Sequence, residues 1–120
     1  MIKILFVDDD VNLLDGLKRM LRKKRDEWDM TFVKSGKEAI ELLENNEYNI
    51  ILSDYKMPEI NGLDLLSLVK DRFPEIKRII LSGQSESEIF YKAKEVANAY
   101  ISKPCDPDEL ISILEKNIDK

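Results

Sequence analysis

The sequence contains no histidine and a single cysteine, and each scarcity excludes a class of chemistry. Without histidine, the chain cannot build a Ser-His-Asp or Cys-His nucleophilic site, a histidine metal site or a phosphohistidine of its own. Cys105 alone can form neither an internal disulfide nor a thiolate cluster for zinc or iron–sulfur. We therefore expect a cytoplasmic protein whose chemistry relies on carboxylates, lysines, hydroxyls and a hard metal ion.

Long apolar runs and an excess of positive charge are also missing. No run approaches the ~18 apolar residues of a membrane-spanning helix, and the opening MIKILFVDDD turns acidic too early for a signal peptide. With 19 basic and 24 acidic residues the net charge is −5, which argues against direct nucleic-acid binding. The length of 120 residues, 43% of them hydrophobic and 36% charged, is typical of one globular domain.

Short apolar segments alternate along the chain with longer segments whose apolar residues recur at helical spacing. The short segments predict strands at Ile2–Val7, Met30–Val33 (with Trp28 ahead of it), Asn49–Ser53, Arg78–Ser82 and Asn98–Ser102. Helices are expected from Val11 to about Arg25, after the N-cap Ser35, over Leu63–Phe73, over roughly Ser85–Glu95, and after the N-cap Asp106. This strict alternation predicts an α/β fold with helices on both faces of a parallel sheet.

Polar side chains follow several of these strands. Asp8–Asp10 come after the first strand and Asp54 after the third, while Ser82 ends the fourth and Lys103 follows the fifth. Taken singly, each has a simpler interpretation, such as an N-cap for Asp10 or a turn former for Asp54. Ligands of open parallel sheets bind beyond the carboxyl ends of the strands, however, and these residues occur there together.

If the first and third strands are neighbours, Asp8, Asp9 and Asp54 converge in one crevice. Each pair of carboxylates then repels by roughly 3 kcal/mol, at about 5 Å and an effective dielectric near 20. Protonation or a bound cation must offset that repulsion, because Lys103 supplies only one positive charge. A hard divalent ion with oxygen ligands, such as Mg²⁺, suits this set of side chains.

Four segments of the chain resemble the receiver domain of two-component response regulators, exemplified by the chemotaxis response regulator. They are ILFVDDD at 4–10, ILSDYKMPEINGLDLL at 51–66, RIILSG at 78–83 and YISKPCDPDEL at 100–110. The match covers essentially the whole chain, so residues 1–120 are expected to be a single receiver domain. The resemblance implies a flavodoxin-like (βα)5 fold with strand order 2-1-3-4-5.

The resemblance also implies a phosphoacceptor and a metal site. Asp54 matches the aspartate that accepts the phosphoryl group. Asp9 and Asp54 match the direct carboxylate ligands of Mg²⁺, while Asp8 acts largely through water. The main-chain carbonyl of Lys56 matches the third protein ligand.

The remaining matches concern the response to phosphorylation. Ser82 matches the hydroxyl that bonds the phosphoryl group, and Lys103 matches the lysine that pairs with that group. The bond between Lys103 and Pro104 matches a cis peptide of the family. Tyr100 matches the switch aromatic, which is expected to turn inward when the Ser82 hydroxyl moves.

The resemblance further implies partners. The phosphoryl group would come from a phosphohistidine of a sensor histidine kinase or phosphotransfer protein, which agrees with the lack of histidine here. Such a domain catalyses only its own phosphorylation and dephosphorylation. Its fourth helix, fifth strand and fifth helix control the output. A fused or separate output domain, and a homodimer through that face, are both compatible with the family.

Three alternative interpretations fit the sequence less well. A phosphohydrolase of the haloacid-dehalogenase type also uses a strand-end aspartate and Mg²⁺, but it needs a second acid where this chain has Lys56. A flavin-binding module needs a phosphate-cradling loop after the first strand, where three acids would repel phosphate. A degenerate receiver, serving only as an interaction module, is disfavoured by the complete set of acids and lysine.

Overall fold

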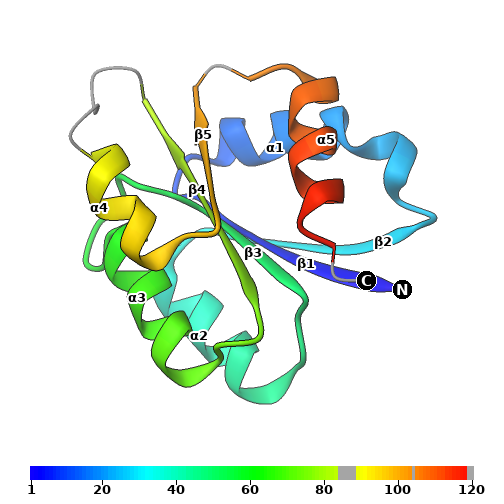
Figure 1. The fold of residues 1–120 in the computed structure, drawn as a ribbon. Helices are drawn as coiled ribbons and strands as arrows, with labels where there is room; N and C mark the ends of the chain where they lie inside the picture. Colours follow the sequence, from blue (N-terminus) through cyan, green and yellow to red (C-terminus); the bar gives the residue numbers. More distant parts are fainter. Residues whose placement is uncertain (84–88, 104, 119–120) are drawn as a thin grey trace.

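The computed structural model describes residues 1–83, 89–103 and 105–118, in which strands and helices alternate. The strands are β1 (Ile2–Val7), β2 (Trp28–Val33), β3 (Ile50–Asp54), β4 (Lys77–Ser82) and β5 (Ala99–Ser102). The helices are α1 (Val11–Met20), the short 3-10 helix η1 (Arg22–Lys24), α2 (Gly36–Asn45), α3 (Gly62–Arg72), α4 (Ile89–Val96) and α5 (Pro107–Lys116). All neighbouring strands pair in parallel in the order β2-β1-β3-β4-β5, so the predicted flavodoxin-like topology is confirmed (Figure 1).

Each face of the sheet is covered by a different set of helices (Figure 1). Because side chains alternate along a strand, Phe6 and Leu52 point to the face that α1 and α5 cover. Leu5 and Ile80 point to the opposite face, under α2, α3 and α4. Strands buried on both faces explain the nearly continuous apolar runs in the sequence. Within the described ranges, no helix has the length and apolar character needed to cross a bilayer.

Side-chain caps fix where four of the helices begin. An oxygen of the cap accepts a hydrogen bond from a backbone N–H of the first turn, which would otherwise lack a partner. The cap oxygens and donors are Asp10 with Asn12 (2.9 Å), Ser35 with Glu38 (3.1 Å), Asn61 with Asp64 (2.9 Å) and Asp106 with Glu109 (2.7 Å). The sequence had indicated three of these caps, whereas it marked Asn61 only as a loop residue.

Two boundaries of the described elements differ from the prediction by more than one residue. Helix α1 ends at Met20 rather than near Arg25, and the chain continues as η1, where the N–H of Lys24 donates to the carbonyl of Leu21 at 2.9 Å. Strand β2 begins at Trp28 rather than Met30, because Trp28 pairs with Ile2 of β1. Trp28 therefore lies in the strand rather than ahead of it, with its side chain buried.

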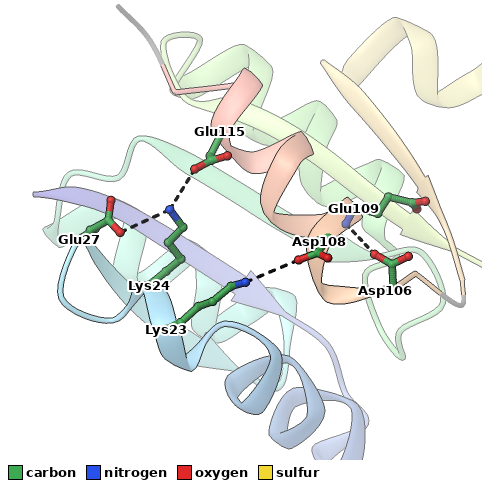
Figure 2. A network of polar contacts seen from close by, with 7 residues as sticks. All are labelled: Lys23, Lys24, Glu27, Asp106, Asp108, Glu109 and Glu115. Carbon is green, nitrogen blue, oxygen red and sulfur yellow. Dashed lines mark hydrogen bonds and ion pairs between the residues drawn. The ribbon is translucent and has the colours of Figure 1, made fainter.

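Ion pairs tie η1 to α5 (Figure 2). The Nζ atom of Lys24 lies 3.0 Å from Oε2 of Glu115 and 3.4 Å from Oε2 of Glu27, while Nζ of Lys23 lies 3.6 Å from Oδ1 of Asp108. The hydrogen bond to Glu115 raises the pKa of Lys24 above its ordinary value. Lys24 also lies over the Trp28 ring, 5.3 Å from its centroid. The basic run at residues 22–25 is therefore only partly exposed to solvent.

Candidate functional site

Three carboxylates converge at the carboxyl ends of β1 and β3. Val7 of β1 pairs with Ser53 of β3, so Asp8 and Asp54 follow at the same level of two adjacent strands. One carboxylate oxygen from each of Asp8, Asp9 and Asp54 lies within 4.8 Å of the other two. Asp8 and Asp54 are only 1% and 6% exposed, whereas Asp9 is exposed. The convergence expected from the strand order is thus present.

Lys103 supplies a positive charge to this cluster. Its Nζ atom lies 2.6 Å from Oδ1 of Asp54 and 3.9 Å from Oδ2 of Asp8. Strand β4 lies between β3 and β5, so the long side chain reaches across one strand to contact Asp54. The backbone N–H of Lys103 donates to the carbonyl of Ser82 at 2.7 Å, which fixes the point from which the side chain starts.

Asp8 occupies an electrostatically unfavourable position. The pKa of its carboxyl is raised from 3.8 to about 6, chiefly by burial and also by the charge of Asp54, although a hydrogen bond from the Asp10 N–H and the charge of Lys103 oppose the rise. Among the described residues, the Oδ2 atom of Asp8 is buried and accepts no hydrogen bond. The 3.9 Å separation from Lys103 is too long for a hydrogen bond.

These observations fit a divalent cation. A buried carboxylate oxygen without a donor, close to two further carboxylates, is the hard-oxygen environment that Mg²⁺ prefers. Asp8, Asp9 and Asp54 would hold the ion. An adjoining hollow of about 420 Å³ is lined by Asp9 and by residues of the β3–α3 loop that include Lys56.

The β3–α3 loop folds back onto Asp54. The N–H of Tyr55 donates to the carbonyl of Leu81 at 2.9 Å, and the N–H of Gly62 donates to the carbonyl of Tyr55 at 2.8 Å. A methyl group on Gly62 would overlap the carbonyl oxygen of Asp54 and lie 2.8 Å from Cδ1 of Ile80. Glu59 adopts a positive φ of 70°, uncommon for a residue other than glycine. The loop is therefore held tightly against the end of β3.

Ser82 and Tyr100 lie on the same face of neighbouring strands. Tyr100 of β5 pairs with Ile80 of β4, and Ser82 follows Ile80 by two residues, so all three side chains point toward the α2–α4 side. Ser82 is fully buried and its Oγ lies 3.5 Å from the Gly83 carbonyl, while Tyr100 is half-buried. Pro104, with the expected cis peptide, and residues 84–88, in the first part of the expected fourth helix, lie outside the described residues.

A family model described as the response regulator receiver domain matches residues 4–115. The chain belongs to this family. This is a family of signalling response regulators. In this receiver, Asp8, Asp9, Asp54 and Lys103 lie together at the carboxyl end of the sheet.

Individual proteins agree with this assignment. The hydrogenase transcriptional regulatory protein HoxA of Cupriavidus necator is 36% identical over 118 residues, which cover 97% of this receiver and 24% of HoxA. A CheY-like receiver domain protein of Methanospirillum hungatei has 29% identity and a TM-score of 0.89, covering 99% of this chain and 94% of that chain. The response regulator TrrA of Thermotoga maritima, solved in complex with Mg²⁺-BeF, has 26% identity and a TM-score of 0.86, covering 98% and 99%.

The receiver spans between 24% and 49% of the length of eight curated relatives, which include the transcriptional regulators HoxA, NtrC and DegU. Their remaining lengths have no counterpart in the 120 residues of this chain. What this receiver controls is therefore treated below as a proposal.

Gly62 is the site residue whose role the sequence did not indicate. From the sequence it is one of several loop markers between a strand and a helix. In the receiver it permits the close approach of the α3 N-terminus to the backbone of Asp54. Its position directly after an Asn N-cap was the available signal, but the overlap itself depends on tertiary packing.

Proposed function

We propose that residues 1–120 form one cytoplasmic receiver domain that accepts a phosphoryl group on Asp54 from a phosphohistidine of a sensor histidine kinase or phosphotransfer protein. The observation that carries this proposal is the 2.6 Å contact between Lys103 Nζ and Oδ1 of the buried Asp54, beside two further carboxylates. The likeness to TrrA, solved in complex with Mg²⁺-BeF, supports it.

In the transfer step, a carboxylate oxygen of Asp54 forms a bond to phosphorus while the P–N bond to the partner's imidazole breaks. The electron pair of the broken bond stays on the imidazole nitrogen, and Asp54 becomes an acyl phosphate. Lys103 and the Ser82 hydroxyl each take a phosphoryl oxygen, which stabilises the charge on the transferred group. Water later hydrolyses the acyl phosphate, so catalysis is confined to the chain's own phosphorylation and dephosphorylation.

Mg²⁺ is the proposed cofactor, with Asp9 and Asp54 as direct ligands, Asp8 acting through water, and the main-chain carbonyl of Lys56 as the third protein ligand. When bound, the ion supplies positive charge to the carboxylates and the phosphoryl oxygens. The burial of Asp8 and the lack of a hydrogen bond to its Oδ2 within the described part of the chain support a cation at this place.

Phosphorylation then acts on the face formed by α4, β5 and α5. The phosphoryl group adds about two negative charges and three strong acceptors, which draw the Ser82 hydroxyl toward Asp54. The Tyr100 ring, on the same face as Ser82, turns further inward, and α4 shifts with it. A fused or separate output domain, or a second copy of the receiver, reads this face.

Intact-mass measurement tests the proposal. With acetyl phosphate or phosphoramidate and Mg²⁺, we expect one phosphoryl group per chain, lost when Mg²⁺ is chelated and lost in Asp54→Asn. Asp64→Asn removes an exposed carboxylate from α3 and serves as the matched control. Equal labelling of Asp54→Asn would refute the assignment, and no labelling of the unmodified chain would favour a degenerate receiver.

A second variant separates acceptance of the phosphoryl group from the response to it. Ser82→Ala keeps Asp54 and the neighbouring acids, so we expect it to be labelled. It should respond poorly, because the hydroxyl that contacts the phosphoryl group is gone. Amide chemical shifts recorded with Mg²⁺, with and without beryllofluoride, are the readout. If beryllofluoride caused the same chemical-shift changes across residues 83–103 in Ser82→Ala as in the unmodified chain, the proposed coupling would be contradicted.

A further inference from the structure

A groove with four cations lies along the edge strand β2, on the side of the sheet that α1 covers. It is a hollow of about 440 Å³ between the second half of α1, η1 and β2. Its cations are Lys18, Arg19, Arg22 and Arg25, and all four side chains are exposed. We call this surface the basic groove.

The cations of the basic groove have no acidic partner among the described residues. Among the residues that the structure describes, none of the four forms an ion pair, whereas the neighbouring Lys23 and Lys24 pair with acids of α5 (Figure 2). With Asp29 as the one acid in the lining, the groove has a net charge of +3 on a chain whose net charge is −5. The positive charge is thus concentrated on one small surface of an acidic protein.

The floor of the basic groove is apolar. Trp28, Met30 and Phe32 alternate along β2 with Asp29 and Thr31, so all three point toward α1. Lys18 lies over the Phe32 ring, with its Nζ 5.3 Å from the centroid. Strand β2 is also the edge of the sheet, pairing with β1, and an edge strand can pair with an added extended segment.

We propose that the basic groove is the docking site for a short acidic segment of a partner protein. The carboxylates of the segment meet the four cations, and its apolar side chains pack on Met30 and Phe32 beside β2. A long polyanion or an anionic bilayer fits less well, because outside the groove the chain carries a net charge of −8 that would repel it. A segment of a few residues covers the groove alone.

Trp28 provides the measurement, because it is the only tryptophan of the chain and it lines the groove. The probe is a synthetic peptide of four Glu-Glu-Leu repeats, and its control has Gln in place of every Glu. We expect the acidic peptide to shift the Trp28 emission and its affinity to fall about tenfold between roughly 0.05 and 0.5 M salt, since exposed charges are screened. The Gln peptide should leave the emission unchanged.

Variants locate the binding. The double variant Arg19→Gln with Arg22→Gln should bind the acidic peptide with an affinity at least about fivefold lower than that of the unmodified chain. Lys37→Gln combined with Lys116→Gln removes the same charge from exposed positions elsewhere and should bind like the unmodified chain. Equal weakening by both pairs would overturn the proposal, because net charge alone would then explain binding.

Other outcomes would also overturn the proposed occupant. The Gln peptide could bind as well as the acidic one. An oligothymidylate, or phosphatidylcholine vesicles containing phosphatidylserine, could shift Trp28 at lower concentration than the peptide. Sedimentation could show a self-association that Arg19→Gln with Arg22→Gln abolishes, which would assign the groove to a second copy. None of these results bears on phosphorylation of Asp54.

Discussion

Replacing Asp8 by asparagine should stabilise the metal-free protein at neutral pH. Asp8 is buried, its pKa is raised to about 6, and its Oδ2 accepts no hydrogen bond from any described residue. The folded state therefore binds a proton at Asp8 more tightly than the unfolded chain does. As pH rises from about 4 through 6, Asp8 ionises at increasing cost to the folded state, and stability falls.

The size of the effect follows from the pKa. A rise from 3.8 to about 6, at about 1.4 kcal/mol per pKa unit, corresponds to a loss of about 3 kcal/mol once Asp8 is ionised in both states. Asparagine stays neutral at every pH, and its oxygen can still accept the hydrogen bond from the Asp10 N–H. The stability difference between Asp8→Asn and the unmodified chain should thus grow from near zero below pH ~4 to about 3 kcal/mol above pH ~7.

Urea unfolding with EDTA, followed by Trp28 fluorescence between pH ~4 and ~8, measures this difference. Asp71→Asn, which removes an exposed carboxylate from α3, is the control and should give a small difference at every pH. Adding Mg²⁺ should reduce the difference in free energy of unfolding between Asp8→Asn and the unmodified chain. The unmodified chain keeps the Asp8 carboxylate and should bind Mg²⁺ more tightly, and a ligand that binds the folded state stabilises it. A difference that stays constant with pH, or a variant less stable than the unmodified chain at pH ~7, would refute the reasoning.

Four further substitutions give three predictions. Gly16→Ala should raise the free energy of unfolding by about 0.5–1 kcal/mol, because alanine loses less backbone entropy in a helix and its methyl group would meet nothing within 4 Å. Gly62→Ala should lower the free energy of unfolding by about 1–3 kcal/mol, because its methyl group would overlap the carbonyl oxygen of Asp54. Urea unfolding measures both changes. Arg78→Met should cost about 2–3 kcal/mol in the same assay, because the buried guanidinium donates to the carbonyls of Val96 (2.6 Å) and Ile76 (2.9 Å). Asp9→Asn should weaken Mg²⁺ binding more than Asp8→Asn in a calorimetric titration, and unchanged affinity would exclude Asp9 as a direct ligand.

The order of the elements could be predicted from the sequence because burial on both faces leaves nearly pure apolar runs. The errors occurred where distant residues decide the local structure. The run at residues 22–25 suits a helix by composition, yet α1 ends before it, and Lys24 contacts Glu115, 91 positions away. The sequence predicts a strand that starts at Met30, whereas the pairing of Trp28 with Ile2 puts Trp28 in β2.

The candidate site could be predicted in part for the same reason. To predict which polar residues meet at the edge of the sheet, only the ends of the strands and their order must be known. The convergence of Asp8, Asp9 and Asp54 follows from these two features. The sequence does not contain the depth at which Asp8 is buried, or the packing of Gly62 against Asp54. The basic groove was missed because its cations meet the aromatic side chains of β2 only in the folded chain.

Hydrogen bonds hold the carboxyl-terminal end of α4 in place, which bears on how the helix moves when Asp54 is phosphorylated. At the carboxyl-terminal end, Arg78 donates to the Val96 carbonyl and the Nζ of Lys70 donates to the Glu95 carbonyl at 2.6 Å. The following Asn98 exchanges two hydrogen bonds with Arg78, of 2.6 and 2.8 Å, at the start of β4. This end of the helix is thereby held to both α3 and the sheet.

The carboxyl ends of β4 and β5 are coupled to the phosphoacceptor Asp54. Lys103 joins Asp54 through its ammonium group and Ser82 through its backbone N–H, so a displacement at Asp54 is passed to the carboxyl ends of β4 and β5 together. We therefore expect α4 to pivot about its Val96 end rather than translate. With beryllofluoride and Mg²⁺, the amide of Asn98 should keep its chemical shift while those of Gly83 and Lys103 change. A shift of Asn98 as large as theirs would mean that the hydrogen bonds of Arg78 do not hold this end of the helix.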